Sequence, residues 1–304
     1  MYGFNNLPNK TDQNTFVFYA NASGSTSGSF QAWNVPEYAS FLHFTVIGGG
    51  GGGGGGGTTG NAFGGLGGAP AGIVAVSIPT ILLPKTLYLQ VSYGGTGGQG
   101  NINANGSPGS SGSISYVCLY PEINPGSILI QSSNVAAGGG GGGTSLSGQL
   151  VLASNIVIAD VLNLKWLGIV GNTVAQTSGV TTDTSVTYAG LLTGGAGGGR
   201  RALPGGNQTM TSINAYVTTT INGGAAGVSA NGSPGNNGYF SWKPFIATGG
   251  AGGGGGATGA FNGGRGGNGA FGCGGGGGGG GGATTVSGGQ GGNGGDGLII
   301  ITVS

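Results

Sequence analysis

Hydrophobic and polar positions alternate over short stretches of this chain, and glycine-rich blocks separate the stretches. The stretches are rich in β-branched and aromatic residues and cover 40–47, 73–83, 86–93, 114–120, 128–131, 212–221, 239–247 and 298–304. Runs of this length and period are typical of β-strands. No stretch shows a convincing amphipathic helical pattern. The sequence therefore predicts an all-β protein without substantial helix.

The segment 149–170 is the longest glycine-poor stretch, and its period is ambiguous. Its apolar residues fit either two buried strands or one helix. Because isoleucine and valine are enriched there, the composition favours strands.

The glycine blocks have a period of three. Residues 288–297 read GGQGGNGGDG, and residues 94–100 read GGTGGQG. A helix of the polyproline II type has three residues per turn and no internal hydrogen bonds, so such a block would present two bare glycine edges and one edge of side chains. Bare edges allow close packing and hydrogen bonding between neighbouring segments. We therefore predict antiparallel strands, arranged as a sandwich or jelly roll, combined with packed polyglycine II segments.

Two other interpretations of the glycine blocks fit less well. A flexible linker would show unphased, serine-rich spacing in one or two runs. Collagen needs one glycine in three over long runs with many prolines, and this chain has 11 prolines in all.

Internal similarity suggests two related modules. The hexapeptide ANGSPG occurs at 104–109 and again at 230–235, each time before a predicted strand. We expect an N-terminal arm over 1–35. A glycine-rich β module over 36–125, a glycine-poor β-rich connection over 126–189 and a second glycine-rich β module over 190–304 follow it.

Composition limits the classes of partner. Glycine contributes 82 of 304 residues, charged residues are only 4%, and the formal net charge is +1. Disordered chains usually combine high charge with low hydrophobicity, so the low charge favours a folded body. No basic stripe of the kind that binds nucleic acid is present, and no apolar stretch is long and uninterrupted enough for membrane insertion.

The sequence predicts no enzyme, no metal site and no cofactor. The six carboxylates are scattered, and the single histidine, His43, lies inside a predicted strand. Cys118 and Cys273 are far apart in the chain, and we expect two buried free thiols. No lysine follows a glycine, which excludes the Walker phosphate-binding pattern.

Recognition residues are sought among the aromatic and basic residues near glycine turns. The candidates are Phe63, Phe261, Phe271, Tyr239, Trp242 and Arg265. Exposed aromatic side chains with adaptable polar neighbours suit protein and saccharide binding. The alternative is that the aromatic residues cover the edge of the core. The adjacent Arg200 and Arg201 are interpreted as a solvated loop feature.

The sequences FTVIGGGGGGGGGG at 44–57 and GGNGGDGLIIITV at 291–303, with the GG-x-GG blocks between them, resemble the glycine-rich domains of bacteriophage tail fibres and adhesins. The resemblance implies polyglycine II bundles whose variable loops bind the host surface. It covers most of residues 36–304 and transfers no individual functional residue.

From the resemblance we expect a viral structural protein on the virion surface, a tail-fibre or adhesin component that mediates host attachment. The N-terminal arm over 1–35 is then a candidate for virion attachment. The alternatives are a spike, head-fibre or capsid decoration protein with a purely structural role, and an ice- or surface-binding protein. Expected partners are other virion proteins, a host cell-surface protein or glycan, and further copies of the chain, with a homotrimer favoured.

Overall fold

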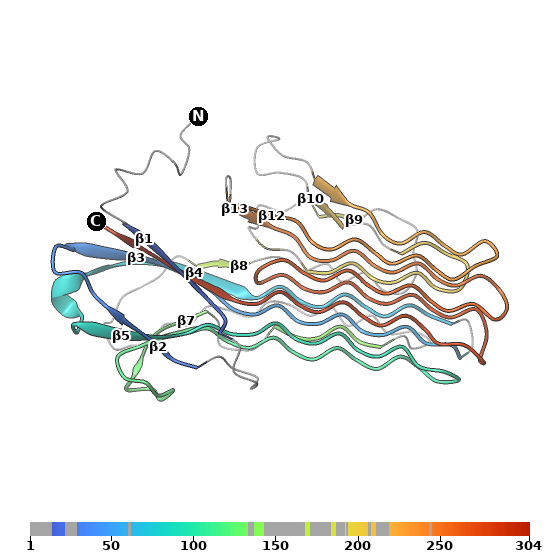
Figure 1. Cartoon of the computed structure of the whole chain (residues 1–304), viewed down its shortest axis with the longest axis horizontal. Helices are drawn as coiled ribbons and strands as arrows, with labels where there is room; N and C mark the ends of the chain where they lie inside the picture. The colour runs from blue at the N-terminus through green and yellow to red at the C-terminus, as the bar shows by residue number, and fades with distance from the viewer. Residues whose placement is uncertain are drawn as a thin grey trace.

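The computed structural model describes residues 14–21, 29–59, 62–132, 137–142, 168–170, 184–186, 192, 194–205, 208–210, 219–242 and 245–304. Figure 1 shows two regions along the long axis of the molecule: the strands of the two larger sheets gather at one end, and undulating glycine segments run side by side to the other. The prediction of an all-β protein is confirmed. Among the described residues, the one helical element is a 3-10 turn, Thr80–Leu82.

Two antiparallel sheets form a sandwich. The first sheet has the order β1-β14-β3-β4-β8 and the second has the order β2-β5-β6-β7. The bounds of the first are Thr15–Tyr19 (β1), Leu298–Val303 (β14), Phe41–Ile47 (β3), Gly72–Pro79 (β4) and Gly168–Val170 (β8). Those of the second are Gln31–Asn34 (β2), Thr86–Gln90 (β5), Tyr116–Cys118 (β6) and Ile128–Gln131 (β7).

The sandwich core follows from the two-residue period of its strands. In β3, Leu42, Phe44 and Val46 face inward, and the neighbouring strand β14 contributes Ile299 and Ile301. The second sheet meets them with residues that include Leu87, Leu89, Val117 and Ile130. Trp33 closes one edge of the sandwich, because its ring packs edge-on against Phe16 at 5.3 Å and Phe18 at 6.3 Å.

Two smaller sheets lie outside the sandwich. One has the order β11-β10-β9, from Thr219–Ile221, Gln208–Met210 and Thr184–Val186, and its β10–β9 pair is parallel. The other pairs β12, Phe240–Trp242, with β13, Phe245–Ala247.

Most predicted strands have a counterpart in the fold. The stretch 128–131 coincides with β7, and 40–47 and 298–304 contain β3 and β14. The predicted strand 73–83 is too long, because β4 ends at Pro79 and the 3-10 turn follows. Of the ambiguous segment 149–170, only β8 lies within the described residues, and of 212–221 only β11 does.

The glycine segments are direct continuations of the strands. Segment 48–58 follows β3, segment 62–71 leads into β4, and segment 287–297 leads into β14. Neighbours in the sheet stay neighbours in the bundle: β3 pairs with β4, and Gly51 N–H donates to Ala69 C=O. The sandwich and the bundle are therefore one continuous body.

Buried hydroxyl groups mark the junction between the two regions. Ser115 Oγ donates to the carbonyl of Ile47 at 2.7 Å and accepts from the amide of Ser92 at 3.1 Å, and Ser132 Oγ accepts from the amide of Ser115. These side chains supply partners to backbone groups where the two-residue period of the strands gives way to the period of the bundle.

Segment 48–58 shows how the bundle is held together. Gly49, Gly52 and Gly55 donate hydrogen bonds to one segment, 104–113. Gly50, Gly53 and Gly56 donate to 287–297, while Gly51, Gly54 and Gly57 donate to 62–71. Successive amides therefore point in three directions in rotation, as a backbone with three residues per turn requires.

The same segment also accepts hydrogen bonds from three other neighbours. Gly95 N–H donates to Gly50 C=O, Gly275 N–H to Gly51 C=O, and Gly140 N–H to Gly52 C=O. Segment 48–58 is thus surrounded by six others. A Cβ added to any residue from Gly49 to Gly56 would come within 3.0 Å of a neighbouring backbone atom, so only glycine fits this central position.

Two further segments, 272–282 and 248–257, are surrounded in the same way. Gly275, Gly276 and Gly277 donate to Gly51, Gly267 and Ala196, in three different segments. In 248–257, Gly250, Ala251 and Gly255 donate to Gly274, Asn236 and Leu203. The two longest glycine runs of the chain, 48–57 and 274–282, therefore occupy the centre of the bundle, where no third edge faces solvent.

Outer segments use polar side chains to replace missing neighbours. Asn237 Oδ1 accepts the amide of Asn268, Asn268 Oδ1 accepts that of Asn293, and Asn293 Oδ1 accepts that of Gly97, at 2.9, 3.0 and 2.9 Å. Asn268 and Asn293 occupy the third position of a GG-x repeat, and Asn237 occupies the third position of the triplet GNN. Their side-chain oxygens satisfy outward amides that no further segment reaches.

Strand pairings cross the predicted domain boundaries among the described residues. Within the predicted arm 1–35, β1 pairs with β14 near the other end of the chain, and β2 pairs with β5. The two glycine-rich modules share the first sheet through β3 and β14. Cys118 and Cys273 are both buried thiols that form no disulfide, as predicted.

Candidate functional site

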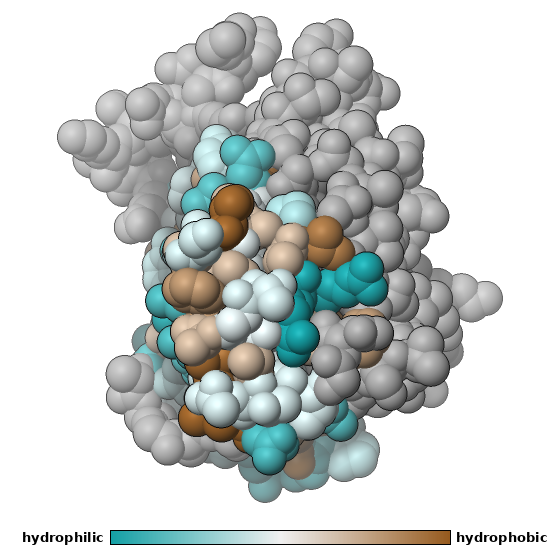
Figure 2. Space-filling model, turned by 90° about the vertical axis from the view of Figure 1, so that its right-hand side faces the viewer, coloured by the Kyte–Doolittle hydropathy of each residue, from teal (hydrophilic) through white to brown (hydrophobic). Residues whose placement is uncertain are grey.

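The turns of the bundle converge at the end of the molecule opposite the sandwich (Figure 1). We call this end the distal tip and define it by the described residues of its turns: 58–59, 62–63, 101–105, 200–203, 228–231, 257–262 and 282–287. Figure 2 looks onto this end and shows a mosaic of polar and apolar residues. It is where this fold can vary side chains without disturbing the packed segments.

Hydrogen bonds join the distal turns to one another. Thr59 Oγ1 donates to Asn105 Oδ1 at 2.9 Å, and Ile102 forms an isolated antiparallel bridge with Ser287. The amide of Ser287 in turn donates to Asn262 Oδ1 at 2.9 Å. Turns distant in the chain are thereby held as one surface.

Backbone conformation also sets the distal tip apart. Among the described residues, the non-glycine residues with positive φ are Ala62 at 48°, Asn103 at 48° and Ala202 at 55°, and all three lie in distal turns. The left-handed conformation costs a residue with a Cβ roughly 1–2 kcal/mol. This cost is tolerated at the tip although glycine is abundant elsewhere in the chain.

Arg200 and Arg201, which were interpreted from the sequence as a solvated loop feature, lie in one of these turns. Arg200 is exposed. Arg201 donates its amide to Ala62 C=O at 3.1 Å, and its Nε lies 3.5 Å from Gly281 C=O, at the end of central segment 272–282. Their adjacency was the available signal, but the sequence did not place their turn beside Ala62 and Gly281.

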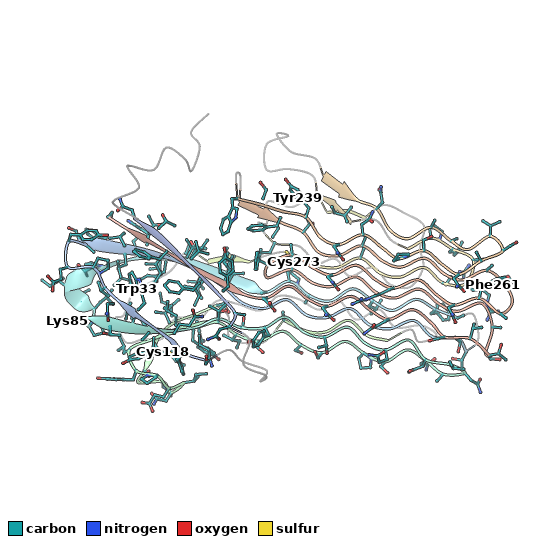
Figure 3. The ribbon with its side chains drawn as sticks, in the orientation of Figure 1. Trp33, Lys85, Cys118, Tyr239, Phe261 and Cys273 are labelled. Carbon is teal, nitrogen blue, oxygen red and sulfur yellow. The ribbon has the colours of Figure 1, made fainter. Side chains whose placement is uncertain are left out.

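Phe63 and Phe261, two of the predicted recognition residues, lie at the distal tip. Both are partly buried. Their carbonyls anchor them to central segments: Gly57 N–H donates to Phe63 C=O at 2.9 Å, and Gly282 N–H donates to Phe261 C=O at 2.7 Å. Figure 3 shows Phe261 at the extreme end of the bundle.

Arg265 lies on the side of the bundle, not at its tip. It occupies the middle of segment 261–270, where its carbonyl accepts the amide of Gly235 at 2.9 Å. Its exposed guanidinium Nη2 lies 3.4 Å from Asn268 Oδ1. The structure therefore separates Arg265 from the distal turns with which the sequence had grouped it.

The remaining candidates, Phe271, Tyr239 and Trp242, lie toward the sandwich. Phe271 packs against Phe240 at 5.0 Å and Tyr19 at 5.8 Å, and Phe240 packs against Trp242 at 4.8 Å. Phe240 was not predicted, yet it joins these rings. Phe240 packs against the buried cluster that includes Ile47 and Leu298, so Phe271 and Trp242 reach the edge of this core through Phe240, whereas the Tyr239 side chain is 44% exposed.

The titratable groups with shifted pKa lie in the sandwich. Burial raises the pKa of Cys118 to about 11, and burial raises the pKa of Tyr116, with a smaller contribution from Cys118. His43 is exposed on β3, with Nδ1 2.6 Å from Ser77 Oγ and Nε2 3.0 Å from Ser304 Oγ. A thiol with a raised pKa is a poor nucleophile at neutral pH.

Within the described ranges, no three His, Cys, Asp or Glu side chains gather in a way that could hold a metal ion. The same ranges contain no helix of the length and apolarity needed to cross a membrane.

Comparison with known protein families matches residues 25–304 to a glycine-rich domain. No curated protein matches the chain. The match spans the bundle and every strand of the sandwich except β1, which agrees with their continuity in the fold.

Proposed function

The chain belongs to this glycine-rich domain family, and we propose that it is a virion-surface protein, a phage tail-fibre or adhesin component that presents its distal tip to the host. The observation that carries the proposal is the placement of the turns. A rigid hydrogen-bonded bundle holds them together at the end farthest from the sandwich (Figure 1). Attachment proteins need such a display, because contacts that are already ordered lose less conformational entropy on binding.

The bundle supplies rigidity without a large apolar core. Each central segment exchanges backbone hydrogen bonds with six neighbours, so bending one segment would break bonds to several others. Distal side chains contribute little to this network. The tip could therefore change its receptor specificity by substitution while the scaffold stays the same.

In this proposal the sandwich end attaches to other virion proteins or to further copies of the chain, a homotrimer being the favoured assembly. Large apolar side chains are exposed there: Tyr38 is 66% exposed, Ile81 90% and Leu82 52%. Ile81 and Leu82 lie in the turn after β4, and Tyr38 lies in the loop before β3. Exposed apolar clusters commonly mark protein contacts.

The same apolar residues also favour the second candidate, a spike, head-fibre or decoration protein with a purely structural role. Such a protein would dock through its sandwich end and bind no receptor. Ice or surface binding is less well supported, since outward positions of segment 287–297 carry Gln290, Asn293 and Asp296 and no single repeated residue.

Fab fragments raised against the purified chain would separate the two candidates. Fabs are sorted by loss of binding to Val228→Glu at the tip or Ile81→Glu at the sandwich end, two side chains that are 92% and 90% exposed. Gold-labelled Fabs then locate the chain on intact particles by electron microscopy. Host adsorption is measured with each class of Fab at saturation.

The host-attachment proposal predicts label at fibre tips and loss of adsorption with tip-directed Fabs, while sandwich-directed Fabs bind intact particles weakly. Label spread over the capsid, with adsorption unchanged by tip-directed Fabs, would replace host attachment by the structural role.

A further inference from the structure

We infer that the distal tip binds an anionic oxygen group, the phosphate or carboxylate of a surface polysaccharide, through Arg200 and Arg201. This inference rests on the proposed function, because it names the class of ligand that the tip would take. It is carried by the charge, position and backbone conformation of the arginine turn.

Charge is distributed unevenly along the molecule. The described turns of the distal tip contain two arginines and no carboxylate. Glu37 and Glu122 lie in loops of the sandwich, between β2 and β3 and between β6 and β7. Among described residues, the tip is therefore the positively charged end.

The one described carboxylate within the bundle is too far away to neutralise the arginines. Asp296 accepts the amide of Gly94 at 2.9 Å, at the sandwich end of segment 287–297. At about 3.1 Å per residue, Asp296 lies roughly 28 Å along the axis from Ser287, which is at the tip. The Debye length at physiological ionic strength is about 8 Å, so the field of Asp296 is screened.

Arg201 is held in place by the packed bundle. Its amide is bonded to Ala62, its Nε approaches Gly281, and the next amide, that of Ala202, donates to Gly256 C=O at 2.8 Å. Guanidinium groups have five N–H donors in a fixed plane and bind phosphate and carboxylate oxygens in pairs. Fixing the backbone reduces the entropy lost when such a pair forms.

Strained residues flank this arginine on both sides. Ala202 follows Arg201 with φ 55°, and Ala62, whose carbonyl accepts the Arg201 amide, has φ 48°. Glycine at either position would remove the strain. Strain that persists in a turn bearing exposed charge is characteristic of binding sites.

The surroundings of Arg200 suit an extended polymer. The backbone around Gly255 brings the arginine turn close to the next one. A Cβ on Gly255 would overlap Arg200 C=O, the Gly255 amide donates to Leu203 C=O, and the Gly227 amide donates to Gly255 C=O. Val228, next to Gly227, is 92% exposed. The arginine turn and an apolar contact are thus adjacent on one open surface, as amphipathic sugars require.

The test measures binding of the full chain to three immobilised polymers: dextran phosphate, carboxymethyl-dextran of equal charge density and unmodified dextran. The variant is Arg200→Gln/Arg201→Gln, and Arg200→Lys/Arg201→Lys keeps the charge without the planar fork. Lys85→Gln removes an exposed charge at the opposite end (Figure 3), and Arg265→Gln removes one from the side of the bundle. Thermal melts confirm that every variant is folded.

We expect the wild-type chain to bind at least one anionic dextran and not the neutral one, with affinity falling as salt rises. The double glutamine variant should bind at least about tenfold more weakly, since charge-assisted hydrogen bonds are lost. Lys85→Gln and Arg265→Gln should stay within about twofold of wild type. The better of the two anionic polymers identifies phosphate or carboxylate.

Three results would overturn the inference. The first is no binding of the wild type to either anionic polymer, and the second is binding by Arg200→Gln/Arg201→Gln as tight as that of the wild type. The third is an equal loss of affinity in Lys85→Gln or Arg265→Gln, which would indicate nonspecific attraction. If tip-directed Fabs still block adsorption in any of these cases, host attachment stands and the receptor is recognised through other chemistry.

Discussion

Replacing Gly53 by alanine tests the packing of the bundle at its centre. Gly53 lies in segment 48–58, where its amide donates to Gly292 C=O and its carbonyl accepts from Gly98 N–H, both at 2.8 Å. A Cβ at this position would overlap the carbonyl oxygen of Gly276 and lie 2.5 Å from its carbon. The obstacle is backbone, so no side-chain rotation can relieve it.

The cost follows from the displacement that the methyl group demands. Ordinary contact begins at 3.4 Å, so relieving the contact with the Gly276 carbonyl oxygen requires segments 48–58 and 272–282 to separate by about 1.3 Å near Gly53. Two hydrogen bonds join these segments beside the site, from Gly275 to Gly51 and from Gly278 to Gly54, both 2.9 Å long. At about 4.2 Å neither remains a hydrogen bond.

We therefore expect Gly53→Ala to lower the free energy of unfolding by about 2–5 kcal/mol. Each buried pair left unsatisfied costs about 1–3 kcal/mol, and the smaller entropy of alanine in the unfolded chain returns about 0.4–1 kcal/mol. Urea denaturation followed by tryptophan fluorescence measures the change, provided that unfolding is reversible.

Gly126→Ala is the matched control. Gly126 lies in an exposed loop of the sandwich, where the nearest atom to an added Cβ is Asn124 Oδ1 at 3.5 Å. This substitution should change the free energy of unfolding by less than about 1 kcal/mol. Equal midpoints for Gly53→Ala and wild type would refute the close packing of the central segment.

Three other predictions concern the hydrogen exchange of amides in the central segment, an asparagine at the edge of the bundle and the buried thiol of Cys118. Amide hydrogens of Gly49–Gly56 should exchange only on global unfolding, because each donates within the packed bundle; exchange at the rate of an unstructured peptide would contradict the hydrogen-bond network. Asn268→Ala should destabilise by about 1 kcal/mol in urea, since the Asn293 amide loses its acceptor, whereas Asn268→Asp keeps that acceptor and should restore much of the loss. Because burial raises the pKa of Cys118 to about 11, the thiol ionises at lower pH in the unfolded chain than in the folded chain, and its contribution to stability should fall between pH 9 and 11. This fall should be absent in Cys118→Ala. Iodoacetamide at pH 8 should label Cys118 only after denaturation.

Local pattern predicted most strands because their determinants are local. The stretches that became β3, β7 and β14 combine β-branched residues with a two-residue period, and each pairs with neighbours over that length. The error at 73–83 came from the same rule. The apolar residues Ile81 and Leu82 lie beyond Pro79 in an exposed turn, and composition alone did not separate them from the strand.

The recognition residues illustrate the limit of local pattern. Phe261 and Phe271 lie at the two ends of one segment and have similar glycine-rich neighbours, yet Phe261 is at the distal tip and Phe271 packs on Phe240. The difference is set by which end of the segment meets the sandwich. Nothing in the sequence near either phenylalanine states that direction.

By itself, the sequence determined the two periods of this protein: two residues in the strands and three in the glycine blocks, where GG-x blocks such as 288–297 carry a side chain at every third position. Both periods follow from backbone geometry and the absence of a Cβ, which are properties of each residue. Only the tertiary structure decided which segments meet. A helix with three residues per turn has no internal hydrogen bonds, so its stabilising hydrogen bonds run between segments. One glycine amide is chemically like another. The placement of Arg201 beside Ala62 and Gly281, and of the distal turns on one surface, therefore depends on the complete set of packed neighbours.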